Sequence, residues 1–165
     1  MANSSYDFVI GLRAIREYTD KPLAAEHLAA ILEAARWTGS AKNRQDWSFI
    51  VIEDGSQLAK VAECGDHTDP LRHSAATIVI VAEPGGYEFD TGRLAQNIML
   101  AAAAIGVASC PITLHRGEDA ARVLGVGEGR KCRFAVALGY PAEHAAPARF
   151  GGRKPLDDLV HRERY

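Results

Sequence analysis

The sequence predicts a mixed α and β protein in which helices pack in layers against a sheet. Segments with helical periodicity alternate with short β-branched runs, which gives about five helices and three or four strands. The chain has 165 residues, of which 47% are hydrophobic and 24% charged, an ordinary globular composition. No repeat or flexible linker divides it, so residues 1–165 are expected to form a single domain.

Two helices are expected in the N-terminal third. Asp7 is a good N-cap residue, and it is expected to begin a short helix near the start of the chain. Apolar residues within 24–37 recur at i, i+3, i+4 and i+7, which indicates an amphipathic helix that Gly39 ends. The residues of this apolar stripe are Leu28, Ile31, Leu32 and Ala35.

Four stretches are expected to be extended. Residues 47–53 form an apolar, β-branched run. Residues 76–83 are apolar without alternation, so this strand is expected to be covered on both faces. Residues 109–114 form a short extended piece, and residues 132–141 a long strand that Pro141 stops.

The remaining helices are expected between these strands and after them. One covers about residues 57–64, and a polar loop follows it to residue 74. A long helix is expected over about 91–107, with Asp90 as its N-cap, and a shorter one over 117–126. Pro155 can open a last short helix or turn.

Composition excludes several classes of function. The formal net charge is −2, whereas a general nucleic-acid binder needs a basic surface, so no nucleic-acid partner is expected. No stretch reaches the roughly 18 apolar residues of a membrane helix, and no signal peptide is recognised. The odd number of cysteines makes a disulfide framework unlikely, so we expect a reducing, cytoplasmic environment. The three cysteines match no zinc or redox spacing, and each is expected to be a small buried apolar residue.

One polar stretch could be imagined as a metal site. It contains two histidines and two aspartates beside a cysteine, but their spacing fits no common metal motif. A solvated loop is the better interpretation of these residues, which are Cys64, Asp66, His67, Asp69 and His73.

Three short segments combine irregular backbone with strong hydrogen-bond donors. The first and third carry pairs of basic residues, and the guanidinium forks of their arginines suit the oxygens of a phosphate. The second carries a hydroxyl and two amides, which suit a ring edge that mixes donors and acceptors. The residues of the three segments are Arg13 and Arg16; Ser40, Asn43 and Gln45; and Arg153 and Lys154.

A phosphate joined to a donor- and acceptor-edged ring describes a nucleotide-like ligand. The alternative is that the arginines are only solvated surface residues, that Ser40 is only a turn residue, and that Asn43 and Gln45 only satisfy loose backbone groups. The helix over 91–107 gives a second indication, because it is apolar nearly all round. Either it is the central helix of a monomer core, or a second subunit covers it.

Four blocks in order resemble the FMN-dependent nitroreductase family, over nearly the whole chain. The N-terminal signature is matched by "RAIREYTDKP", "EAAR" and "SAKNRQDW" before a strand. The central helix and the strand that enters the flavin site are matched by "DTGRLAQNIMLAAAAIGVASCPI". The last core strand and the basic C-terminal segment are matched by "ALGYP" and "RKPLDDLV". The resemblance implies an α+β fold, a mixed sheet flanked by helices, and an intertwined homodimer.

The same resemblance implies where FMN would be held. The first and last segments would contact the phosphate and the pyrimidine edge, and the middle segment would reach the flavin from the partner chain. A strand segment would lie against the ring and offer a backbone N–H toward N5. The residues so assigned are Arg13, Ala14, Arg16, Ser40, Asn43, Gln45, Pro111, Ile112, Thr113, Arg153 and Lys154.

The activity implied is an NAD(P)H-dependent flavin oxidoreductase. NADH or NADPH would be the electron donor, and nitroaromatics, quinones or similar small molecules the acceptors, in a ping-pong cycle. The cofactor carries the chemistry, and no side chain is assigned as an acid or base. The alternatives are a flavin-binding or regulatory module without turnover, and a dehalogenating or flavin-cleaving relative of the same fold.

Overall fold

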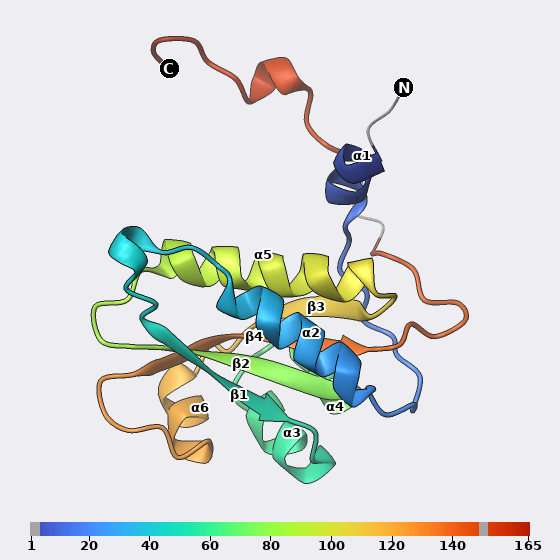
Figure 1. Cartoon of the computed structure of the whole chain (residues 1–165), viewed down its shortest axis with the longest axis vertical. Coiled ribbons are helices and arrows are strands. Elements are labelled where there is room, and N and C mark those ends of the chain that lie inside the picture. The colour runs from blue at the N-terminus through green and yellow to red at the C-terminus, as the bar shows by residue number, and fades with distance from the viewer. Residues whose placement is uncertain (1–3, 149–151) are drawn as a thin grey trace.

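A four-stranded antiparallel sheet forms the centre of the molecule, as a computed structural model that describes residues 4–148 and 152–165 shows (Figure 1). The strands stand in the order β1-β2-β4-β3, and each is antiparallel to its neighbours. Their bounds are Trp47–Ile52 for β1, Ala76–Ala82 for β2, Ala108–Thr113 for β3 and Lys131–Gly139 for β4. The two longest strands, β2 and β4, are therefore central, and β1 and β3 form the edges.

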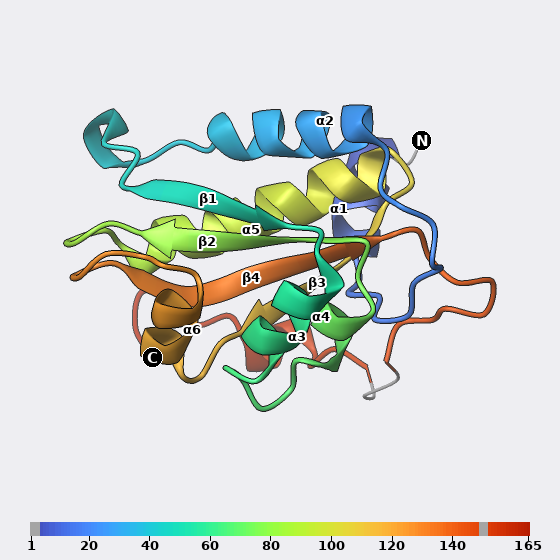
Figure 2. The same ribbon diagram turned by 90° about the horizontal axis from the view of Figure 1, so that it is seen from below.

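Helices cover both faces of this sheet (Figure 2). One face carries α2 (Ala25–Arg36) and the 17-residue helix α5 (Glu88–Ala104). The other face carries three short helices, α3 (Gly55–Ala62), α4 (Asp69–Arg72) and α6 (Gly117–Val123). Three further segments lie outside these layers: α1 (Ser4–Gly11) and the 3₁₀ turns η1 (Ala41–Asn43) and η2 (Leu156–Asp158).

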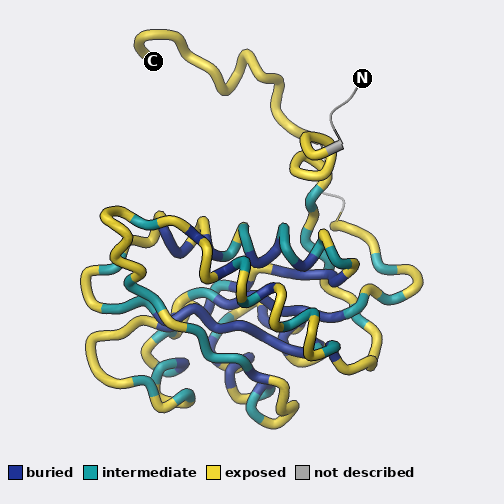
Figure 3. Tube along the Cα trace, in the orientation of Figure 1, coloured by how far each residue is buried: buried dark blue, intermediate teal, exposed yellow. Residues whose placement is uncertain are grey.

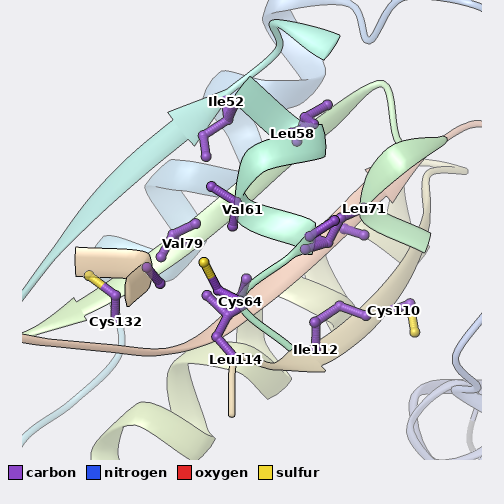
Figure 4. Close-up of a cluster of buried hydrophobic side chains, with 14 of the residues drawn as sticks. Ile52, Leu58, Val61, Cys64, Leu71, Val79, Cys110, Ile112, Leu114 and Cys132 are labelled. Carbon is purple, nitrogen blue, oxygen red and sulfur yellow. The ribbon is translucent and has the colours of Figure 1, made fainter. Parts of the chain in front are cut away.

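The core forms as two apolar clusters, one on each face of the sheet. Alternate residues of β2 and β4 point to opposite faces, so both strands are buried on both sides, as the run without alternation predicts. Figure 4 shows the cluster under α3 and α4, where Leu58, Val61 and Leu71 meet Val79 of β2. The cysteines Cys64, Cys110 and Cys132 are buried and free, which confirms that they act as small apolar residues.

Most expected helices and strands are confirmed, whereas two predicted helix starts are wrong and one short helix was not predicted. Asp7 lies inside α1 and not at its N-cap. The helix α5 begins at Glu88 and not after Asp90, because the turn that Gly86 closes onto the Glu83 carbonyl ends just before Tyr87. The polar loop after α3 contains α4, whose Pro70 suits a first helical turn.

Two segments project from the body and bury little of themselves. Figures 1 and 3 show that α1 and the chain from residue 152 onward leave the same side of the molecule and are exposed along their length. Their apolar side chains face solvent: Tyr6, Val9, Ile10, Leu156, Leu159 and Val160. The helix α5 buries one side on the sheet, while Gly92, Gln96 and Ala104 on its other side are exposed. The sheet is therefore complete in one chain, whereas these surfaces have no cover.

Candidate functional site

The first arginine segment is fixed across the ends of β3 and β4. The backbone N–H of Ile15 donates to the carbonyl of Ser109 at 2.9 Å, and that of Thr19 donates to the carbonyl of Tyr140 at 2.9 Å. Tyr18 also forms an isolated bridge with Pro141. An extended chain that adds to a sheet edge in this way has a defined register. Arg13, Ala14 and Arg16 are therefore held at one end of the sheet.

A tyrosine that sequence reasoning missed locks this segment in place. The side chain of Tyr18 packs closely against Gly139, where an added Cβ atom would stand only 2.7 Å from the Tyr18 Cγ. Its hydroxyl donates to the carbonyl of Ile15 at 2.9 Å, and burial raises the pKa of Tyr18. Tyr18 therefore stays neutral and positions the segment. The only signal in the sequence is that a glycine and a bulky aromatic residue are both present, and the sequence does not show that Tyr18 and Gly139 are in contact.

Basic side chains surround a hollow of about 420 Å³ beside this segment. Arg13 donates to the carbonyls of Ile10 and Leu12, both at 2.8 Å, so part of its fork is used by the end of α1. Within the described residues, Arg16 and Arg153 have no hydrogen-bond or ion-pair partner. The hollow is lined by Arg13, Ala14, Arg16, Pro147, Ala148, Gly152 and Arg153. Unpaired guanidinium groups around a hollow are suited to bind an anion such as a phosphate.

The open edge of β3 supplies a backbone donor. Residues of a strand direct their N–H and C=O groups alternately to either side. The Leu114 N–H points toward β4 and donates to the carbonyl of Arg133 in that strand at 2.8 Å. The Ser109 carbonyl points the other way and accepts from the Ile15 N–H. By this alternation, Ile112 directs its N–H toward β4, and Thr113 directs its N–H to the open edge. Because Pro111 has no N–H, Thr113 is the donor of this strand segment.

The loop over residues 38–46 is strained and uses its own polar groups. Lys42, Asn43 and Gln45 have φ of 55°, 54° and 53°, a region that costs a non-glycine residue about 1 kcal/mol or more. The Ser40 hydroxyl accepts from the Gln45 N–H at 2.9 Å, and the Gln45 amide donates to the Asn43 carbonyl at 3.4 Å. Ser40 and Gln45 therefore satisfy loop backbone, as the alternative interpretation predicts. The side-chain amide of Asn43 is exposed and unpaired within the described residues.

Two arginines that sequence reasoning missed attach this loop to the start of α5. Arg93 donates to the Gly39 carbonyl at 2.6 Å. Arg44, which belongs to the loop, pairs with Asp46, the only acid of the loop, at 2.7 Å, and donates to the Gly85 carbonyl just before α5 at 3.5 Å. The amide of Asn97 donates to the buried Thr38 hydroxyl at 2.8 Å. The strained backbone is thus held by contacts from outside it.

Pro111, Ile112 and Thr113 lie on β3, and the other sequence-predicted residues form two groups at opposite ends of α5. Arg13 and its neighbours lie beside the C-terminal end of that helix, where Ala103 of α5 and Gly106 just after it line a hollow with α1. The loop with Ser40 and Asn43 lies at its N-terminal end (Figure 1). A 17-residue helix is about 25 Å long. One chain therefore does not bring the two groups together, and Lys154 is exposed and outside the lining of the hollow.

The residues present fit parts of an FMN molecule. The unpaired Arg16 and Arg153 match the charge of its phosphate, and the Thr113 N–H matches an acceptor atom on a ring edge.

In the part of the chain that the structure describes, no group of three or more His, Cys, Asp or Glu residues could hold a metal ion. No helix among the described residues is long and apolar enough to cross a membrane.

Comparisons with known proteins identify relatives along the whole chain. The model of the nitroreductase family matches residues 11–66 and 66–140. A protein of Archaeoglobus fulgidus, provisionally named NADH dehydrogenase/NAD(P)H nitroreductase, is 32% identical over 93% of this chain and 94% of its own length. A protein of Methanothermobacter thermautotrophicus with the same name is 28% identical over 93% of this chain and 83% of its own.

Solved structures show the same fold. A nitroreductase-type protein of Parabacteroides distasonis superposes with a TM-score of 0.87 at 20% identity, and the match covers 99% of both chains. The structure of NfrA1 of B. megaterium superposes with a TM-score of 0.88 at 23% identity, covering 99% of this chain and 75% of the other. The order of the sequence blocks, the sheet and the family match agree: the chain belongs to the nitroreductase family, with its α+β fold.

Proposed function

We propose that this protein is an NAD(P)H-dependent flavin oxidoreductase that binds FMN between two copies of the chain. The observation that carries the proposal is the separation of two polar groups by the length of α5, about 25 Å. A ligand of nucleotide size that contacts both groups must take them from different copies. Family membership and the relatives' names support the same cofactor and electron donor.

Each copy contributes a different half of the proposed site. Arg16 and Arg153 bind the phosphate, with Arg13 beside them in the lining of the hollow. The Thr113 N–H donates toward the flavin ring, and Pro111 and Ile112 of the same strand lie beside it. The second copy supplies its loop of residues 40–45, whose exposed Asn43 amide can pair with both donors and acceptors.

The exposed surfaces of the single chain support this homodimer. Gly92, Gln96 and Ala104 of α5 are exposed, and α1 and residues 152–165 expose apolar side chains that a second copy can cover. Arg153 belongs to one of these projecting segments, so dimer formation and phosphate binding are linked. An intertwined dimer therefore completes the site and buries these surfaces in one step.

When bound, FMN supplies the two-electron transfer from NADH or NADPH to a small acceptor, such as a nitroaromatic or a quinone, in a ping-pong cycle. The chain's own residues bind, orient and neutralise charge. A guanidinium such as that of Arg16, in a site from which water is excluded, stabilises negative charge by a few kcal/mol. No proton-transferring side chain is required of the described residues.

One spectroscopic experiment tests the proposal. The purified protein, saturated with FMN and freed of unbound flavin, is mixed with NADH or NADPH without oxygen. The proposal predicts that the flavin absorbance band bleaches and returns when a quinone is added. Flavin that stays bound but never bleaches would instead support a binding or regulatory module, and a protein that rejects FMN would overturn the proposal.

A further inference from the structure

A small hollow lies at one edge of the molecule, between the turn that joins β2 to α5 and the chain that leads into β4. Figures 1 and 2 show these two segments side by side. They touch at Gly129, where an added Cβ atom would stand 3.3 Å from Cγ of Pro84. The hollow has a volume of about 230 Å³, and it shares no lining residue with the hollow around Arg13 and Arg16.

A β-bulge in β4 turns consecutive side chains into this hollow. Ile80 pairs with Phe134 and Ala82 pairs with Lys131, so β4 has one residue more than β2 over this stretch. In a regular strand, neighbouring side chains point to opposite faces. Here the neighbours Arg133 and Phe134 both line the hollow, together with Lys131. The bulge therefore brings one aromatic ring and two cationic groups to the same hollow.

The floor of the hollow is apolar, and no side chain fills the space above it. Ile80 is buried, and Ala82 and Phe134 are half-buried in the lining. The turn at its side is made by Gly85 and Gly86, which carry no side chain to occupy it. An apolar cavity of about 150 Å³ holds a benzene molecule. This hollow therefore has room for one aromatic ring with a small substituent.

The charged groups around the hollow leave one positive charge without a partner. Glu83 pairs with Arg130 at 2.8 Å, and Glu88 pairs with Arg133 at 3.0 Å. Within the described residues, Lys131 has no hydrogen-bond or ion-pair partner. The two glutamates balance the two arginines, so Lys131 remains as a single positive charge. This balance favours a ligand that carries one negative charge.

We propose that this hollow binds a small aromatic carboxylate, with its ring on the apolar floor and its carboxylate at Lys131. The Arg133 guanidinium lies over the Phe134 ring at 5.4 Å and donates to Glu88, and its other N–H groups can donate to the same carboxylate. Because the Phe134 ring is part of the lining, an aromatic ligand gains a ring contact that an aliphatic acid lacks. One chain supplies every group, so the site does not rest on the proposed function.

A titration with benzoate tests this site through the backbone amide signals of the ¹⁵N-labelled protein, with and without FMN. Saturable shifts are expected at the amides of Gly85, Gly86 and Gly129, which line the hollow. Benzyl alcohol lacks the charge and cyclohexanecarboxylate lacks the aromatic ring, so both are expected to bind more weakly. Lys131→Met removes an exposed charge and is expected to raise the Kd for benzoate roughly 1.4- to 5-fold. Lys60→Met, on the exposed side of α3, is the control and is expected to keep the Kd.

A second variant tests the space itself. Ala82→Leu adds three carbon atoms to the floor and is expected to abolish the shifts at the three glycines, while a thermal melt checks that the protein is folded. If this variant does not fold, the Lys131→Met titration decides alone.

Three results would overturn the inference. They are glycine amides that do not shift, benzyl alcohol that binds as tightly as benzoate, and equal effects of Lys131→Met and Lys60→Met. Shifts confined to Arg16 and Thr113 would place benzoate at the proposed flavin site and would also overturn it. None of these results depends on bleaching by NADH or NADPH, so the proposed function stands or fails separately.

Discussion

The sheet with its covering helices and the segments around it differ in how completely one chain satisfies them. In the sheet, two clusters bury their apolar side chains, and among the described residues no buried side-chain nitrogen or oxygen lacks a hydrogen-bond partner. In α1 and residues 152–165, leucine, isoleucine and tyrosine side chains face solvent, and Arg153 has no partner among the described residues. The core folds from one chain, whereas the candidate site lies where one chain is incomplete.

This difference separates what stabilises the fold from what performs the chemistry. The core depends on packing that does not involve a second copy, so its mutations act on the stability of every species. The projecting segments contribute little within one chain, so their mutations are expected to act on association and on FMN. Substitutions in the core are therefore expected to lower the free energy of unfolding, and substitutions in the projecting segments are expected to weaken dimer formation and FMN binding.

The largest effect on stability is expected in the core. Leu138 of β4 is fully buried between the central strands and α5. Leu138→Ala is expected to lower the free energy of unfolding by about 2–5 kcal/mol, because it removes apolar contacts and leaves a cavity. Urea denaturation measures this loss. The matched substitution Ile10→Ala, in the exposed α1, is expected to leave the core stability within about 0.5 kcal/mol and to weaken the dimer instead.

The next effect is expected in FMN retention. Arg16→Ala and Arg153→Ala each remove a charge-assisted contact worth about 1.5–3 kcal/mol, which corresponds to a roughly 10- to 150-fold rise in Kd for FMN. Equilibrium dialysis measures this rise. Arg122→Ala is the control, because Arg122 pairs with Asp119 on α6, far from the hollow. Equal FMN binding by the Arg16 and Arg153 variants would contradict the phosphate assignment.

The sequence predicted the fold well where a pattern is local. The unbroken apolar run of β2 and the spaced apolar stripe of α2 need no knowledge of the rest of the chain. The start of α5 was predicted wrongly because Asp90 is a good N-cap residue, whereas the preceding glycine turn decides the boundary. The four-residue helix α4 was missed because so short a helix has no periodicity to detect.

The candidate site was predicted by residue type and resemblance, but its arrangement was not. Paired arginines and amides indicate a nucleotide-like ligand, and the structure gathers Arg13, Ala14, Arg16 and Arg153 around one hollow. No sequence pattern reveals that Ser40 and Asn43 lie at the other end of α5. The roles of Arg44 and Arg93 also depend on contacts between segments about 40 to 55 residues apart, which a linear pattern does not encode.

The smallest effect is expected at a helix cap among the helices that cover the sheet, away from the projecting segments. The Asp54 carboxylate accepts from the Gln57 N–H at 2.8 Å and begins α3. Asp54→Ala is expected to lower Tm by about 2–4 °C near neutral pH, the size of one lost cap. The shift should not depend on FMN, which a thermal melt with and without the cofactor checks.

The same cap has a defined pH dependence. Hydrogen bonds from Ser56 and Gln57 hold the pKa of Asp54 below its usual value. Because the pKa is lower in the folded state, the contribution is complete above the unfolded value of about 3.9 and is lost as the pH falls through the folded value. The difference in Tm between wild type and Asp54→Ala is therefore expected to shrink on acidification. A difference that grows below that pH would contradict the assignment of the cap.

The most direct measurement is the mass of the species that carries flavin. The FMN-saturated protein is passed over a sizing column with light scattering, with absorbance recorded in the protein and flavin bands. We expect flavin to elute with particles of twice the chain mass, and Arg16→Ala to elute as a dimer with less flavin. A flavin-carrying species with the mass of one chain would contradict a site completed by two copies.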